Sequence, residues 1–258
     1  MSTLAVDTMW MTHRRLQAFV RQPAFLVITL VQPVIWLFLF GSLFREVVEL
    51  PGFGTSSYLD YLVPGVVVMS AVSSNMWAGM GTMEEIERGT LNRFLTTPVS
   101  RAAIMNANVV EQAVSTTIQS VVIVLLGWLA GARYPGGVGG TALLIVASVL
   151  LGTVFSAFSN TIGMLVRQRE SIIGINTFLL LPLTFLSSAF MASTLMPGWM
   201  QAIAKANPVD WAVRAGRDAL SADPDWPAIL TRGGALLALA AAMVWLSTRT
   251  FRSYQKSV

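Results

Sequence analysis

Uncharged and largely apolar residues fill six long stretches of the sequence. These stretches contain no Lys, Arg, Asp, Glu or His, and they cover residues 22–44, 61–83, 112–132, 134–166, 171–204 and 233–248. A helix that crosses a hydrocarbon core of about 30 Å needs about 20 such residues. An ionised side chain at mid-bilayer costs roughly 2.5–3.5 kcal/mol, whereas a soluble helix places charges along its outer face. The pattern therefore predicts an all-α polytopic membrane protein.

Charge and turn signals set the expected limits of six transmembrane helices. We expect them at about residues 23–44, 61–83, 112–132, 141–166, 171–192 and 230–249. Pro33 and Pro182 predict kinks, because neighbouring helices can satisfy the backbone groups that proline frees. The last uncharged stretch has only sixteen residues, so its helix is expected to lengthen by snorkelling of Arg232 and Arg249 or by recruiting residues 226–230.

Two further segments carry amphipathic patterns outside these spans. Residues 1–22 place Val6, Trp10 and other apolar residues at helical spacing, which favours an interfacial helix over an unstructured lead-in. Residues 193–222 are too long for a simple loop, and we expect re-entrant helices there, between spans five and six. With few residues left over, all 258 residues are predicted to form a single membrane domain.

Composition and charge agree with the membrane class. Hydrophobic residues make up 54% of the chain, charged residues 12%, and the mean hydropathy is +0.64. The sequence pI is about 10.0, but the basic residues flank the spans, where they meet anionic lipid headgroups, so no nucleic-acid partner is expected. Lys and Arg are more numerous in the segments on the side of the N-terminus, which predicts a cell-membrane protein with both termini in the cytoplasm.

Several kinds of chemistry are missing from the sequence. The two lysines, Lys205 and Lys256, lie outside any Gly-Lys-Ser/Thr loop that could hold a nucleotide. One histidine, His13, cannot make a His-rich metal site. The uncharged stretches also lack the buried carboxylates that ion-coupled carriers use. We therefore expect no catalytic residue, metal or cofactor in this chain, and an energy source in a partner protein.

The segment 84–111 between spans two and three is the longest predicted cytoplasmic loop. Gly89 and Pro98 bracket about two helical turns, which place Leu91, Phe94 and Leu95 on one face. A helix this short is unstable alone. It is suited to docking on another protein, and the alternative is a helix that lies on the membrane surface.

Two groups of motifs resemble those of one known family. The runs 87–91 (Glu-Arg-Gly-Thr-Leu) and 97–101 (Thr-Pro-Val-Ser-Arg) are similar to the loop between spans two and three of type-2 ABC exporter permeases, especially the daunorubicin-resistance branch. A second match follows span five, and the resemblance covers essentially the whole chain. This second match comprises Phe185, Ser187, Phe190, the run 197–201, Asn207, Pro208, Ala212, Arg214 and Arg217.

The resemblance implies an architecture and a set of partners. Such permeases pair with a second copy or a paralogue, and each half docks on a separate ATPase subunit that binds ATP and Mg. Spans one, two and five line the pathway at the dimer axis. The implied coupling residues are Glu84, Glu85, Glu87, Arg88, Gly89, Leu91, Arg93, Phe94, Leu95 and Pro98. The implied outer re-entrant residues are Pro197, Gly198, Trp199, Asn207, Pro208 and Arg214, and the Asp210-Trp211 pair departs from the family pattern.

A pathway without intramembrane charge suits an amphipathic drug or a lipid-like solute, in contact with membrane lipids. The candidate lining residues are Ser73, Ser74, Asn75, Met76, Asn176, Phe178 and Phe185. Each could instead pack between helices or face lipid, since Ser and Asn often bond across helices in membranes. Three other functions remain open: export of a polysaccharide or glycolipid, a passive channel, and a membrane anchor for a partner.

Overall fold

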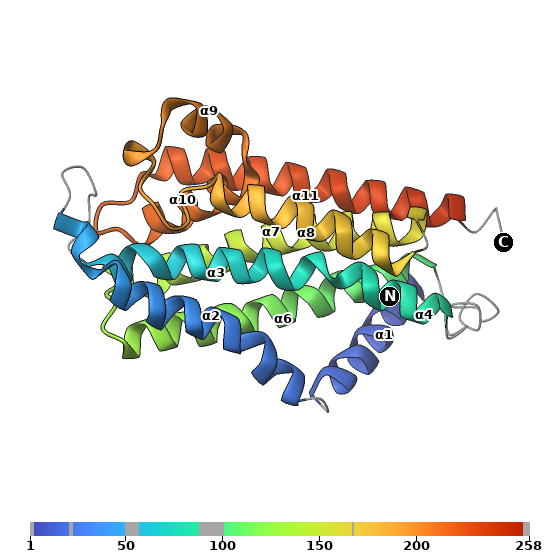
Figure 1. Cartoon of the computed structure of the whole chain (residues 1–258). Coiled ribbons are helices and arrows are strands. Elements are labelled where there is room, and N and C mark those ends of the chain that lie inside the picture. Colours follow the sequence, from blue (N-terminus) through green and yellow to red (C-terminus); the bar gives the residue numbers. More distant parts are fainter. Residues whose placement is uncertain (1–2, 21–22, 50–56, 88–100, 167, 255–258) are drawn as a thin grey trace.

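The computed structural model describes the chain except for residues 1–2, 21–22, 50–56, 88–100, 167 and 255–258. Within the described part the regular elements are helices, and no strand occurs there. The long helices lie side by side in one elongated bundle (Figure 1). In chain order they are α1 (Thr3–Val20), α2 (Pro23–Leu43), α3 (Tyr58–Met76), α4 (Ala78–Glu87), α6 (Arg101–Leu129), α7 (Gly137–Val166), α8 (Arg169–Phe185), α9 (Gly198–Ala206), α10 (Pro208–Leu220) and α11 (Trp226–Tyr254), with short 3-10 turns at Arg45–Glu49 and Ser193–Leu195.

Four regions of the described chain are long and apolar enough to cross a membrane. They are Tyr58–Gly81, Ala107–Leu129, Gly137–Val166 and Trp226–Thr250. The described apolar part of α2, Thr29–Leu43, is shorter, and α8 has 17 residues. The prediction of an all-α, multi-pass membrane protein is confirmed. Four of its six expected spans meet this length. Expected span five falls short of it, and expected span one, which corresponds to the 21-residue helix α2, is described only in part, so the count of six stays a prediction.

The helix α7 lies at the centre of the bundle and packs against α3, α4, α6, α10 and α11. Small residues allow this close packing. A Cβ atom added at Gly140 would lie 2.1 Å from the Ala219 carbonyl oxygen in α10. The backbones of α7 and α10 therefore touch directly, which a larger side chain would prevent.

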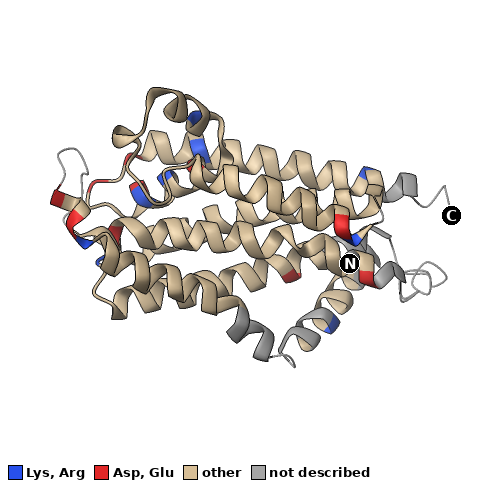
Figure 2. Ribbon diagram, in the orientation of Figure 1, with Lys and Arg blue, Asp and Glu red and all other residues tan. Residues whose placement is uncertain are grey.

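Charged residues gather at the two ends of the bundle, and the middle is almost free of them (Figure 2). The first turn of α1, the last turn of α11 and α4 lie toward the same end (Figure 1). This agrees with the expectation that both termini lie on one side of the membrane. The assignment of that side to the cytoplasm stays a prediction.

Some boundaries differ from those expected from the sequence. The expected helix 61–83 is broken at Trp77, between α3 and α4. The helix α6 begins at Arg101, so residues 101–111 of the expected coupling loop are helical. The helix α7 begins at Gly137, where φ is +60°, a value that glycine adopts without strain. The helix α11 recruits residues 226–230, as one of the two expected ways of lengthening that span.

The fifth expected span, residues 171–192, ends early. The helix α8 continues through Pro182 but stops at Phe185. The following residues 186–192, here called the 186–192 segment, are irregular and largely buried. Their backbone groups bond to side chains from other helices, and this explains why the helix can end inside the protein.

Candidate substrate pathway

A cavity of about 240 Å³ lies between α2, α3 and α6. The helix α2 contributes Gln32 and Trp36 to its lining, α3 contributes Ser73, and α6 contributes Gln119. Trp77, at the break between α3 and α4, also lines it. Hydroxyl and amide groups thus stand beside indole rings and aliphatic side chains. Among the described residues, the lining has no charged side chain. Such a site can bind a neutral or weakly charged molecule that has both polar and apolar parts.

The structure separates the predicted lining residues into two groups. Ser73 and Ser74 line the cavity. Asn75 is buried on another face of α3 and donates a 2.8 Å hydrogen bond to the Thr116 hydroxyl of α6. Met76 is fully buried, and its carbonyl accepts a hydrogen bond from Asn176 of α8.

The two predicted aromatic residues of α8 lie elsewhere. Phe178 is 76% exposed on the outside of the single chain. Phe185 lines a second cavity of about 320 Å³, which lies at the end of the bundle near α9. This second cavity is more apolar, and its walls include Phe40, Phe44, Phe190 and Met200.

An aromatic cluster separates the two cavities. Trp36 lines the first cavity and Phe40 lines the second. The ring of Phe190 packs against both, with centroid distances of 5.1 Å to Trp36 and 5.4 Å to Phe40. Phe44 extends the cluster, 5.3 Å from Phe40. The linings of the two cavities therefore meet at these rings along α2.

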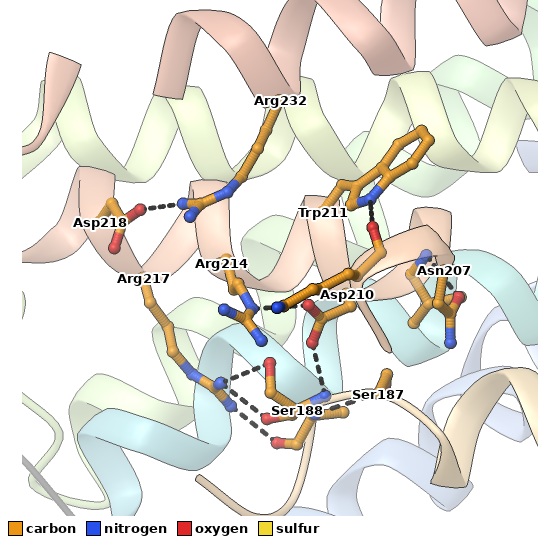
Figure 3. Close-up of polar contacts among 12 residues, drawn as sticks. Ser187, Ser188, Asn207, Asp210, Trp211, Arg214, Arg217, Asp218 and Arg232 are labelled. Carbon is orange, nitrogen blue, oxygen red and sulfur yellow. Dashed lines mark hydrogen bonds and ion pairs between the residues drawn. The ribbon is translucent and has the colours of Figure 1, made fainter. Parts of the chain in front are cut away.

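At the end of the bundle near α9, a half-buried arginine holds three elements together. Arg217 of α10 donates hydrogen bonds to the carbonyls of Ser188 (2.7 Å) and Ala189 (2.8 Å) in the 186–192 segment. It also donates to the carbonyl of Tyr61 in α3, at 3.1 and 3.2 Å. The Tyr61 hydroxyl donates to the same Ser188 carbonyl at 2.8 Å. Figure 3 shows the guanidinium of Arg217 pointing at the 186–192 segment.

Other polar residues of α10 complete this network (Figure 3). Asp210 is 1% exposed, pairs with Arg214 at 2.6 Å and accepts a 2.8 Å hydrogen bond from the Ser188 amide. Asn207 caps α10 by accepting from the Val209 amide, and it donates to two carbonyls near the end of α8. Asp218 forms an ion pair with Arg232 of α11. Each of these side chains thus has at least one polar or charged partner, as burial of polar groups requires.

Two side chains at this end of the bundle have pKa values shifted by their surroundings. Burial lowers the pKa of the Arg217 guanidinium, whereas Tyr61 and Asp210 raise it. Arginine stays protonated in proteins because its pKa is above 12 in water. Between α6 and α7, burial raises the pKa of Tyr134, and the Asp60 carboxylate raises it further. The Tyr134 hydroxyl therefore stays neutral and donates to the Val124 carbonyl.

The predicted coupling residues fall partly outside the described chain. Arg88, Gly89, Leu91, Arg93, Phe94, Leu95 and Pro98 lie outside the described residues. Glu84, Glu85 and Glu87 belong to the last turns of α4, which leads into that segment. Of the predicted outer residues, Pro197 precedes α9, Gly198 and Trp199 begin it, and Asn207, Pro208 and Arg214 belong to the start and middle of α10.

Sequence reasoning missed two features of this arrangement. Asp210 was taken as a departure from a family pattern, whereas it bonds to both Arg214 and the 186–192 segment. The break at Trp77 was not expected, although the preceding run Ser-Ser-Asn was a signal, since such side chains bond to nearby backbone groups. Within the described residues, no group of three or more His, Asp or Glu could hold a metal ion.

The fold defines a multi-pass helical membrane protein, and the two cavities described above have no charged residue among the described residues of their lining. The chain belongs to the ABC-2 type transporter family, which it matches over residues 6–220. Permeases of this family normally work with an ABC ATPase.

Named relatives support this membership. The chain is 31% identical over 218 residues to the daunorubicin resistance ABC transporter permease protein of Streptomyces coeruleorubidus, covering 81% of this chain and 73% of the relative. It is 22% identical to the probable doxorubicin resistance ABC transporter permease protein of Mycobacterium tuberculosis, covering 82% and 75%. It is 25% identical to the inner membrane transport permease YadH of Escherichia coli K12, covering 89% and 88%. These relatives are named as transport permeases and not as enzymes.

Proposed function

We propose that this chain is the transmembrane permease subunit of an ATP-driven exporter. Its substrate is an amphipathic drug or a lipid-like molecule, which leaves the cytoplasm or the inner leaflet of the cell membrane. ATP and Mg are bound by a separate ATPase subunit. The names of two relatives, which refer to daunorubicin and doxorubicin resistance, agree with a substrate of this class.

The cavity between α2, α3 and α6 carries the proposal. Its lining combines Ser73, Gln32 and Gln119 with Trp36 and Trp77, so polar and apolar parts of one molecule both find partners. Its volume of about 240 Å³ is slightly smaller than the 300–1,000 Å³ typical of ligand pockets. A second permease copy or a paralogue would complete the site. The exposed apolar residues Val31, Ile35 and Leu39 on α2 suit contact with lipid as well as with the apolar surface of a second permease.

The transport cycle follows from the two cavities and the cluster between them. The first cavity takes the substrate from the side of α4, and the second releases it near α9. The aromatic cluster of Trp36, Phe40, Phe44 and Phe190 closes the path between them. Energy reaches the chain through the docking helix at about residues 87–97, held by the partner ATPase, while the helices reorient as rigid elements.

The aromatic cluster does not favour the glycan alternative. Export of a long polysaccharide calls for ring faces that are free to stack on sugars. Here the rings of Trp36, Phe40 and Phe190 pack on one another, with centroids 4.5–5.4 Å apart. A neutral amphipath small enough to pass between such rings fits the arrangement better.

Reconstitution tests the proposal. The tagged chain is purified from its own cells, its copurifying ATPase is identified, and the complex is placed in liposomes with external daunorubicin and ATP. We expect vesicle uptake of daunorubicin that requires ATP hydrolysis. The matched control is the same complex with an ATPase variant that binds ATP without hydrolysing it. Equal flux with this control would indicate a passive channel, and copurification without flux of daunorubicin or a fluorescent phospholipid would indicate an anchor.

A further inference from the structure

The membrane-spanning region Tyr58–Gly81 contains a break in its helical hydrogen bonding. The helix α3 ends at Met76 and α4 begins at Ala78. The Gly79 amide donates to the Ser159 hydroxyl of α7 at 3.0 Å, and not to the backbone of its own helix. The Met76 carbonyl accepts hydrogen bonds from the Ser159 hydroxyl and from the Asn176 amide of α8. Side chains of two other helices thus replace the missing backbone bonds.

This replacement explains how the break survives inside a membrane protein. An unsatisfied backbone group is costly in hydrocarbon, and breaks within spans persist where neighbouring helices satisfy the freed groups. Ser159 and Asn176 are both buried, at 0% and 1% exposure. Proline does not cause the break. The proline of the region Tyr58–Gly81, Pro64, lies twelve positions before Met76.

Side chains just before residue 77 compete with the helix backbone. Ser74 and Asn75 each donate to the carbonyl four residues earlier, at 2.8 Å, a pattern of bonding that weakens and often bends a helix. Just after the break, α4 touches α7 closely. A Cβ atom at Gly79 would lie 2.3 Å from the Ser159 carbonyl oxygen. The backbones of α4 and α7 therefore touch at Gly79. If this contact stays in place, the far end of α4 can rotate about it.

We propose that Ser159 and Asn176 are positioning residues that hold a hinge at Trp77, through which movement of α4 changes the shape of the substrate cavity. The inference rests on the proposed function, because α4 leads directly into the predicted docking segment. Trp77 lies at the break and lines the cavity, with 42% of its surface exposed. Rotation of α4 about the break therefore displaces the indole against the wall that Ser73 and Ser74 form.

The experiment uses paired spin labels, for which the chain is convenient because it contains no cysteine. One pair, Gly81→Cys with Trp128→Cys, spans the hinge, and both sites are exposed. A reference pair, Trp128→Cys with Leu237→Cys, excludes α4. The pairs are placed in wild-type, Ser159→Ala, Asn176→Ala and Ser159→Thr backgrounds. Ser148→Ala is the matched control, since Ser148 is equally buried in α7 but bonds only within its own helix, to Leu144.

The isolated permease gives the first readout. Loss of one buried hydrogen bond, as in Asn176→Ala, shifts the equilibrium between bent and other forms roughly fivefold to tenfold, and Ser159→Ala removes two such bonds. We expect Ser159→Ala and Asn176→Ala to broaden the distribution of distances across the hinge. The distribution should stay as narrow as in the wild type in Ser148→Ala and in Ser159→Thr, which keeps the hydroxyl group. The reference pair stays unchanged in all variants. Unchanged distances across the hinge in both Ser159→Ala and Asn176→Ala would overturn the proposal, as would equal broadening in Ser148→Ala.

The ATPase complex gives the second readout. In the wild-type complex, trapping of ATP should shift the distance across the hinge, and Ser159→Ala should lower daunorubicin transported per ATP hydrolysed by roughly tenfold, with hydrolysis retained. An ATP-driven transporter whose hinge distance never changes would overturn the hinge while leaving the proposed function intact. A wild-type permease that recruits no ATPase would overturn the proposed function instead. In that case the distances in the isolated permease would still test whether Ser159 and Asn176 hold the hinge.

Discussion

The guanidinium of Arg217 lies over the ring of Tyr61, with its central carbon 3.4 Å from the ring centroid, and also donates two hydrogen bonds to the Tyr61 carbonyl. This pair joins α10 to the first turn of α3. Because Arg217 also holds the carbonyls of Ser188 and Ala189, a single side chain fixes the position of the 186–192 segment. That segment carries Phe190, which belongs to the cluster between the two cavities.

Replacing Arg217 with Leu should strongly destabilise the protein. The change leaves the Ala189 carbonyl without its hydrogen-bond donor and removes one of the two cations near Asp210, and breaking a buried charge network typically costs about 3–5 kcal/mol. The apparent melting temperature in detergent should fall clearly. Arg249→Leu is the matched control, because Arg249 is exposed and its guanidinium carbon lies 5.3 Å from the ring centroid of Trp245, which is also exposed. Equal melting temperatures for the two variants would show that the Arg217 network is not needed for the fold.

A methyl group at Gly65 should disturb the same region from the other side. A Cβ atom there would lie 2.3 Å from the Ala189 carbonyl oxygen, so α3 and the 186–192 segment must move apart. Overpacking of this kind costs about 1–3 kcal/mol. Gly65→Ala should therefore lower the apparent melting temperature and the yield of monodisperse protein on size exclusion. Gly174→Ala, which meets nothing within 4 Å, should behave like the wild type.

The sequence was sufficient to predict the class of fold and the family, but not the internal geometry. Exclusion of charge from long stretches is imposed by the bilayer itself, so it is readable residue by residue. The end of α8 at Phe185 was not readable, because it depends on Arg217 and Asp210, which bond to the 186–192 segment from more than twenty residues away. The sequence shows a long apolar run there, and only tertiary contacts end the helix.

The candidate site was predictable in part for the same reason. Ser73 and Ser74 were expected on the pathway and line the cavity, but Asn75 lies on another face of the same helix. In the uncharged run 61–83, the sequence pattern does not distinguish the helix face that lines the cavity from the face that packs on other helices, because small polar residues occur on both faces. Gln32, Trp36 and Gln119 were not expected at the site, because their contact with α3 depends on how the helices pack.

Phe94 offers a test of the predicted docking helix. On the expected apolar face with Leu91 and Leu95, an aspartate would place a charge in the packed contact with the ATPase, where anchoring aromatic residues carry most of the affinity. Phe94→Asp should reduce ATP-dependent transport by about tenfold or more, with an unchanged melting temperature of the permease. Asn92→Asp, on the opposite expected face, should transport normally. Normal transport by Phe94→Asp would remove the basis for this coupling segment.

The most direct test of the central claim is substrate protection of a single cysteine at Ser73. In a chain without natural cysteine, Ser73→Cys places one thiol in the cavity between α2, α3 and α6. A membrane-permeant maleimide should label it roughly tenfold more slowly when daunorubicin is present at ten times its Kd. Val138→Cys, 88% exposed at the start of α7, should be labelled at the same rate with and without the drug. Equal labelling of Ser73→Cys with and without daunorubicin, in a complex that transports the drug, would contradict the assignment of this cavity to the pathway.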